Sequence, residues 1–221
     1  MRKTIAAAAL LFAATSAFAD RHVVHKFDST APAAGVRRVV IEIPAGEVTI
    51  RNGSAKELRI FGHVEREYDG WRRAEENQKI VDDISAEIRV SNEEAVVRRR
   101  FGPNAHGWRG SHSNEFHITI EVPAGVSLDF ETSYGEVNID GAFGDVMIDL
   151  RAGEINLRTP RANVRELNAS CRVGEVRTNL GHEIIEREGI FPRTTHWSKE
   201  TGSSRLDVHV TAGEVNITLT Q

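Results

Sequence analysis

The sequence predicts an all-β protein built as a β-solenoid, a β-helix-like stack of short strands, with one short helix. Two observations lead to this prediction. A phrase made of glycine, an acid and an aliphatic residue recurs six times along the chain. Within each copy, aliphatic and polar residues alternate, which is the period of a strand with one buried face. Because such a short unit cannot bury its own aliphatic side chains, the units must stack around a shared core.

The spacing of the phrase supports stacking. In the stretch YGEVNIDGAFGDVMIDLRAGEINL, from Tyr134 to Leu157, three copies follow one another at intervals of nine residues. That interval fits a strand of about five residues and a turn of about four. The leading glycine indicates a turn with positive φ or a close backbone approach. The six copies begin at Gly46, Gly135, Gly144, Gly153, Gly174 and Gly213. An antiparallel β-sandwich of short hairpins is the alternative, and the regular spacing favours the solenoid.

Residues 1–19 have the pattern of a secretory signal peptide. Arg2 and Lys3 precede an apolar run, and Ala17 and Ala19 are the small residues of a cleavage site. Cleavage after Ala19 would leave 202 residues, exported to a periplasm or secreted. No later stretch is apolar enough to cross a membrane, so we expect no transmembrane segment after signal cleavage.

We expect residues 20–221 to form a single domain, because no stretch has the composition of a linker. Residues 121–221 hold the regular repeats. Residues 20–120 form a less regular N-terminal part, with a short helix near 71–84 that Asp69 can cap. Strands are expected in this part at 39–43, 48–51, 58–64, 86–90, 95–101 and 115–122.

Composition limits the possible partners and the redox chemistry. Without Arg2 and Lys3, 26 basic and 32 acidic residues remain, a net charge of −6. This acidic balance disfavours a nucleic-acid partner. Cys171 is the sole cysteine, so an intramolecular disulfide is impossible. Its place in the alternating pattern predicts an inward-facing, buried thiol.

The acids of the repeated phrase are the first candidate site. They are Glu47, Glu136, Asp145, Glu154, Glu175 and Glu214. In a regular stack, neighbouring members would lie about 4.8 Å apart, or twice that if alternate units form each face. The glycine-rich nonapeptide that binds calcium carries additional Gly and Asp residues that are absent here. We therefore interpret the acids as a solvated structural face and expect no cofactor. A second column, Asn138, Asn156 and Asn216, predicts stacked side-chain amides or plain solvation.

Two polar insertions are the second candidate site. One contains His106, Trp108, Arg109 and His112, and the other contains His196 and Trp197. An exposed Trp beside Arg suits glycan stacking or a protein contact. Alternatively, each Trp folds back and covers an end of the solenoid. The histidines show no zinc-binding spacing, and the chain has no nucleophile motif.

The phrases GEVTI, GEVNI, GDVMI, GEINL and GEVRT, taken in series, resemble the adhesin β-repeat family of unknown function called DUF4097, which is related to the toastrack family. The resemblance covers about Val39 to Gln221. It implies an exported β-helix-like domain, sometimes linked to envelope sensing, and it supplies no catalytic residues. We expect a non-catalytic binding or structural protein of the cell envelope that contacts an envelope protein or a glycan. The alternatives are an accessory protein in envelope-stress sensing and a polysaccharide-active β-helix enzyme.

Overall fold

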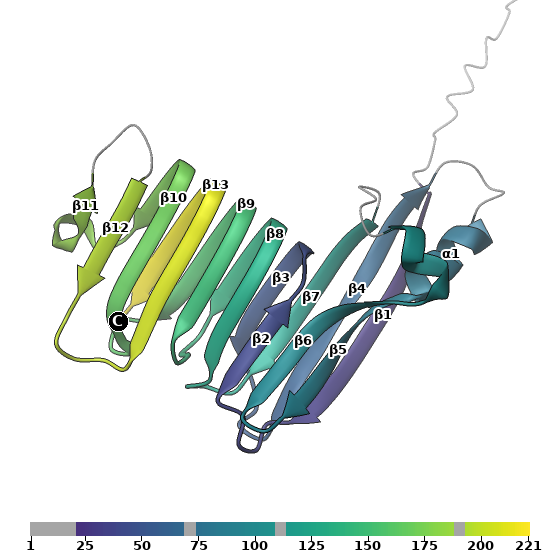
Figure 1. The fold of residues 1–221 in the computed structure, drawn as a ribbon, viewed down its shortest axis with the longest axis horizontal. Coiled ribbons are helices and arrows are strands. Elements are labelled where there is room, and N and C mark those ends of the chain that lie inside the picture. Colours follow the sequence, from purple (N-terminus) through teal and green to yellow (C-terminus); the bar gives the residue numbers. More distant parts are fainter. Residues whose placement is uncertain (1–20, 69–73, 109–113, 188–192) are drawn as a thin grey trace, which may run out of the picture.

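The computed structural model of the protein describes residues 21–68, 74–108, 114–187 and 193–221. Within these ranges the chain is almost entirely strand, with one α-helix and two short 3₁₀-helices (Figure 1). The strands lie side by side along the long axis of the molecule, and the helix lies at the end that holds the N-terminal strands. The expectation of an all-β chain with one short helix is confirmed.

The elements are named in chain order. Those of the N-terminal part are β1 (Arg21–Pro32), β2 (Arg38–Glu42), β3 (Ala45–Asn52), β4 (Glu57–Tyr68), α1 (Ala74–Asp82), β5 (Ile84–Ser91), β6 (Glu94–Phe101), η2 (Pro103–Trp108) and β7 (Asn114–Val122). Those of the repeats are β8 (Ser127–Asp140), β9 (Val146–Pro160), β10 (Val164–Thr178), η3 (Gly181–Glu183), β11 (Ile185–Arg187), β12 (Arg193–Ser198) and β13 (Ser204–Thr220).

The four long strands β8, β9, β10 and β13 each contribute to two faces. Their first halves pair with one another and with β2, and their second halves pair with one another and with β3. We call these the first face and the second face. All of these pairings are parallel, so each long strand is one rung, and β2 with β3 forms a fifth. Because the rungs pair in parallel, the β-solenoid is confirmed and the hairpin sandwich is not adopted.

A glycine marks the corner where each rung passes from the first face to the second. Gly135 and Gly153 have φ of 136° and 142°, a region that favours glycine. They lie opposite each other in register, 18 residues apart. A Cβ on Gly153 would lie 1.9 Å from the carbonyl oxygen of Gly135. No side chain fits at this corner, which explains why the phrase begins with glycine.

The nine-residue interval is therefore half a rung. Gly144 lies in the turn that leads into β9 on the first face, and its φ is not in the positive region. A Cβ there would meet the Ser127 Oγ at 2.6 Å. Thus the middle copy of the phrase uses glycine for close packing between turns, whereas its neighbours use it for a corner.

The core lies between the two faces and is formed by in-register columns of aliphatic residues. Two columns of the second face are Val48, Val137, Ile155 and Val215, and Ile50, Ile139, Leu157 and Ile217. All eight are at most 2% exposed. Burying each such side chain contributes about 1.5–3 kcal/mol relative to exposure. Cys171 is fully buried on the first face, as predicted.

The order of the rungs departs from the order in the sequence. β13 lies between β9 and β10 and pairs in parallel with both (Figure 1). A stack built in sequence order would pair each strand with its predecessor, and β10 and β13 do not follow this order. The sequences of the rungs are so similar that any of them fits beside any other, and the pattern alone does not define their order.

At the N-terminal end the rungs give way to antiparallel strands. On the second face β7 continues the stack beside β3, and β4 and β1 follow it antiparallel. On the first face β6 pairs with β2, and β5 follows antiparallel. The six strands predicted from the sequence here are present, whereas β1 is an additional one. The predicted helix is α1, and Trp71 and Asp69 lie outside the described residues.

Candidate functional site

Five of the six repeated acids form one continuous column on the outer side of the second face. Their order across the strands is Glu47, Glu136, Glu154, Glu214 and Glu175. Adjacent strands are about 4.8 Å apart, so neighbouring carboxylates repel one another unless other groups compensate. The column is the consequence of placing the acid directly after each corner glycine.

Neighbouring side chains stabilise the two ends and the middle of this column. Arg177 contacts Glu175 at 2.6 Å and Glu214 at 3.0 Å, and the hydrogen bond to Glu175 raises the pKa of Arg177. At the other end, the His117 Nδ1 lies 2.8 Å from the Glu47 carboxylate. Between them, amides donate to Glu136 and Glu154.

Asp145 does not belong to the acidic column, contrary to the prediction from the sequence. It lies in the turn before β9, at the edge of the first face. Its backbone N–H donates to the Ser127 Oγ, and its carboxylate accepts from the backbone N–H of Arg205. Because nine residues are half a rung, the middle copy of the phrase falls on the opposite face from its neighbours.

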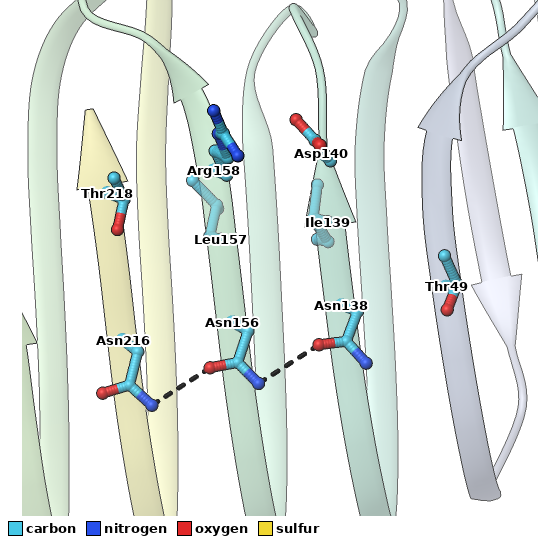
Figure 2. Close-up of a pocket in the computed structure, with 9 residues that line it drawn as sticks. All are labelled: Thr49, Asn138, Ile139, Asp140, Asn156, Leu157, Arg158, Asn216 and Thr218. Atoms are coloured by element: carbon cyan, nitrogen blue, oxygen red, sulfur yellow. Dashed lines mark hydrogen bonds between the residues drawn. The ribbon is translucent and has the colours of Figure 1, made fainter. Parts of the chain in front are cut away.

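The predicted asparagine column is a hydrogen-bonded ladder on the second face (Figure 2). The Asn216 side chain donates to Asn156 at 3.0 Å, and Asn156 donates to Asn138 at 3.1 Å. Asn216 and Asn138 also donate to Glu154 and Glu136 of the acidic column. The amide and carboxylate columns therefore hold each other in fixed orientations.

A shallow hollow of about 230 Å³ lies beside the ladder. Beyond the three asparagines, its polar lining comes from Thr49, Asp140, Arg158 and Thr218. Asp140 and Arg158 lie opposite each other on β8 and β9. The hollow thus presents amide, hydroxyl and both signs of charge on strands held rigidly by the stack (Figure 2).

Two histidines continue this outer surface toward β4. His63 and His117 lie opposite each other, and their rings stack with centroids 4.6 Å apart. His117 also lies 3.5 Å from the Glu115 carboxylate. Sequence reasoning missed this pair, because the antiparallel register of β4 with β7 is not visible in the chain. Among the described residues, no group of three or more His, Cys, Asp or Glu side chains is placed to hold a metal ion.

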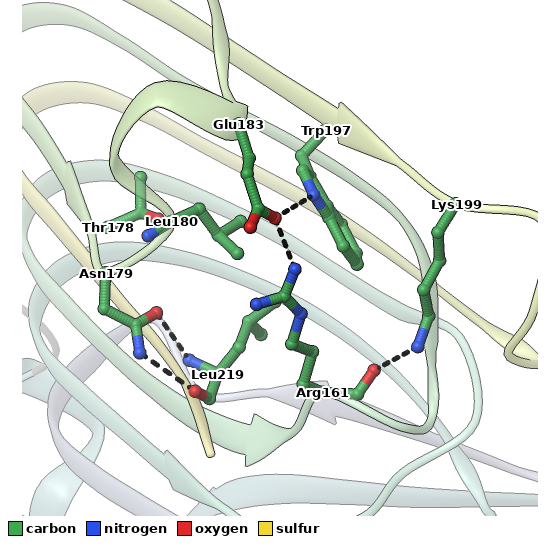
Figure 3. A network of polar contacts seen from close by, with 8 residues as sticks. All are labelled: Arg161, Thr178, Asn179, Leu180, Glu183, Trp197, Lys199 and Leu219. Carbon is green, nitrogen blue, oxygen red and sulfur yellow. Dashed lines mark hydrogen bonds and ion pairs between the residues drawn. The ribbon is translucent and has the colours of Figure 1, made fainter. Parts of the chain in front are cut away.

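Trp197, from the second insertion, closes the stack beyond β10. Its side chain is 5% exposed, so of the two interpretations the covering one describes it. The indole Nε1 donates to Glu183 at 3.3 Å, and Glu183 forms an ion pair with Arg161 (Figure 3). The Arg161 guanidinium lies 5.4 Å from the centre of the indole ring. Lys199 completes the cluster by donating to the Arg161 carbonyl at 2.6 Å.

Of the other candidate contact residues in the two insertions, some lie within the described part of the chain and others lie outside it. The His196 ring lies 2.7 Å from the Asn168 amide oxygen on the outer side of the first face. His106 and Trp108 lie in η2, which fixes their place in the backbone. Arg109 and His112 lie outside the described residues.

A serine and a histidine meet on the first face. The Ser170 Oγ lies 2.7 Å from the His209 Nδ1, and Asp149 follows His209 on the next strand. In a hydrolytic triad the acid must accept a hydrogen bond from the histidine. The site must also have an oxyanion hole of free backbone N–H groups. In the described part of the chain the contact of the His209 ring is with Ser170 and not with Asp149, and the N–H groups here belong to strand ladders. The pair is a cross-strand contact.

The chain is thus a two-faced parallel β-solenoid with glycine corners and a polar outer ladder. The model of the Toastrack DUF4097 family matches residues 33–218. The protein therefore belongs to this family, as the repeated phrases indicated. A search of curated proteins finds no match.

A comparison with solved structures finds proteins with adhesion names at low sequence identity. A putative cell adhesion protein from Clostridium sporogenes is 14% identical, with a TM-score of 0.50, over 90% of this chain and 100% of that one. A putative adhesin from Bacteroides fragilis is 8% identical, with a TM-score of 0.29, over 89% of this chain and 97% of that one. The first supports the fold, and the second is too distant to support an argument.

Proposed function

We propose that the protein is an exported, non-catalytic, adhesin-like binding protein of the cell envelope. Its contact surface would be the outer side of the second face, around the asparagine ladder. The observation that carries this proposal is the in-register arrangement of carboxylates and amides beside the hollow of about 230 Å³.

The physical basis is preorganisation. The side chains of the ladder are already fixed by hydrogen bonds to one another, so a ligand binds without ordering them. Amides, hydroxyls and a charged pair on one flat surface favour a ligand rich in hydrogen-bonding groups, such as a glycan or a polar protein surface. The adjacent acidic column disfavours polyanions.

The place of action rests on the signal-peptide pattern of residues 1–19, which predicts a periplasmic or secreted protein. Among the described residues, no helix is both long and apolar enough to cross a membrane. The Clostridium sporogenes structure shares the fold and carries a cell-adhesion name, which is consistent with a role at the envelope.

The first insertion is proposed as a second contact region, through His106, Trp108, Arg109 and His112. The second insertion contributes less, because Trp197 is buried and only His196 lies on an outer surface. Replacing Trp108 with alanine tests this part. Unchanged binding to cell walls and envelope extracts would remove the insertion from the proposal.

The main test is a matched pair of substitutions that add one long charged side chain to each face. Thr218→Arg fills the hollow on the second face, whereas Met147→Arg changes an exposed position on the first. We expect purified protein to sediment with cell-wall or envelope fractions, with at least tenfold weaker binding for Thr218→Arg and no change for Met147→Arg. Equal binding by both variants and by the natural chain would exclude the second face as the contact surface.

The same experiment separates the alternative functions. An accessory role in envelope-stress sensing would appear as capture of a single envelope protein, independent of Thr218→Arg. A polysaccharide-active enzyme would release new sugar ends from the cell-wall fraction.

A further inference from the structure

Arg99 is the residue whose environment neither the fold nor the proposed contact surface explains. It belongs to β6, where Ala95 and Val97 are fully buried and point inward. Alternation along the strand places Arg99 on the same inward side and Arg98 and Arg100 on the outer side. A guanidinium thus enters the space between the two faces at the N-terminal end of the stack, away from the ladder.

Two aromatic rings flank this guanidinium. Its central carbon lies 4.5 Å from the centre of the Phe116 ring and 4.9 Å from that of Phe101. Phe116 is 2% exposed and stacks on Phe27, with centroids 5.5 Å apart. The rings attract the cation through their π faces. They accept none of its in-plane N–H groups.

Arg99 also lacks a compensating acid in the described part of the chain. No carboxylate there lies within ion-pair distance of it, whereas its neighbour Arg98 pairs with Glu87. The Nε of Arg99 is buried and has no hydrogen-bond partner, and its two terminal nitrogens are not among the buried unpartnered atoms. Burial lowers the pKa of Arg99 to about 10, so it remains charged at neutral pH.

We propose that Arg99 is the centre of a carboxylate-binding site, in which the two terminal nitrogens hold the anionic group of a small ligand. A planar guanidinium between aromatic rings leaves only its edge for binding, and a carboxylate matches that edge with two parallel hydrogen bonds. Arg99 lies between the faces and makes no contact with the ladder, so this site is independent of the proposed contact surface.

The experiment compares the effect of anions on the melting temperature and on binding heats. Full mature protein is titrated with sodium acetate and sodium glucuronate at constant ionic strength, against sodium chloride and sodium sulfate. We expect a saturable rise in melting temperature with both carboxylates that exceeds the rise with chloride. A larger response to glucuronate than to acetate would indicate a sugar acid, and an equal response would indicate the carboxylate alone.

Two variants and one control assign the response to Arg99. Arg99→Met keeps the apolar stem and should lose the carboxylate response. Its melting temperature without anion should equal or exceed that of the natural protein, because the change removes a largely buried charge that has no acid partner among the described residues. Arg99→Lys keeps the charge but not the fork, and should bind at least tenfold more weakly. Arg100→Met removes an outward charge from the same strand and should respond normally.

The proposal is overturned if the natural protein shows no saturable carboxylate response beyond chloride, or if sulfate gives the larger response. It is also overturned if Arg99→Met responds as the natural protein does. If Arg99→Met does not fold, the titration of the natural protein and of Arg99→Lys still decides the question.

Discussion

The five rungs and the N-terminal end of this molecule share one core but are stabilised in different ways. In the rungs, each position faces the same kind of residue on the next strand: glycine beside glycine, acid beside acid, amide beside amide. At the N-terminal end, individual contacts replace repetition. Arg66 is buried and bonds to Asn77 and Asn114, and the Phe27 and Phe116 rings stack. In the rungs, the repeated sequence stabilises the stack through in-register backbone pairing. The N-terminal end is stabilised by contacts between particular side chains.

The largest loss of unfolding free energy should come from substituting a corner glycine. In Gly153→Ala, the new Cβ would lie 1.9 Å from the Gly135 carbonyl oxygen at a φ of 142°, so the strands must separate. We expect a loss of more than about 4 kcal/mol of unfolding free energy, the range of exceptional substitutions. Denaturant unfolding followed by circular dichroism measures it.

Gly125→Ala is the matched control for the corner. Its φ of 79° is also unfavourable for alanine, but a Cβ there meets nothing within 4 Å. We expect a loss of only about 1–2 kcal/mol. Equal losses in the two variants would show that backbone conformation alone, without the close approach between rungs, requires glycine at the corner.

Substitution of Trp197, which covers the stack beyond β10, should cause the next largest loss of unfolding free energy. Trp197→Ala removes a buried indole and leaves Glu183 without its Nε1 donor. We expect a loss of about 3–5 kcal/mol in the same unfolding experiment. Trp197→Phe retains most of the packing and should lose less. If Trp197→Ala unfolds like the natural protein, the stack does not need a cover beyond β10.

The ladder should contribute less than the corner. Asn156→Ala breaks the bonds to Asn138 and Asn216, and we expect a loss of about 1–2 kcal/mol. Thr49→Ala changes the same row of the second face outside the ladder, and should change the unfolding free energy by less than about 0.5 kcal/mol. A comparable loss for Thr49→Ala would mean that row position, not amide pairing, determines the effect.

The smallest effect concerns acid sensitivity at the N-terminal end. A hydrogen bond from Arg98 lowers the pKa of Glu87 below its ordinary value of 4.5. Its contribution to stability is therefore fully present above pH 4.5 and is lost as the pH falls through the lower pKa of the folded state. The unfolding free energy of Arg98→Met should fall less steeply below pH 4.5 than that of the natural protein. Parallel curves would contradict this assignment.

The difference between the rungs and the N-terminal end also explains which features of the structure can be predicted from the sequence. The corner glycines, the inward aliphatic columns, buried Cys171 and the asparagine column were all predicted, because each depends only on period and residue type. Whether the asparagines bond to one another or to water was left open by the sequence. Asp145 was misplaced because a nine-residue interval does not reveal whether it spans a whole rung or half of one. The stacked histidines, and Arg99 with no acid partner among the described residues, depend on antiparallel register at the N-terminal end, where the sequence does not repeat.

The position of β13 has a consequence for the order of assembly. β13 follows β10, β11 and β12 in the chain, yet it separates β10 from β9. A chain translated as far as β12 would have β8 beside β9 and β12 beside β10, but the strand that joins β9 to β10 would be missing. The stack therefore closes only after the last strand has been made. We expect release of the chain in an unfolded form to be compatible with transport, and a chain truncated before β13 to be a ready substrate for proteases.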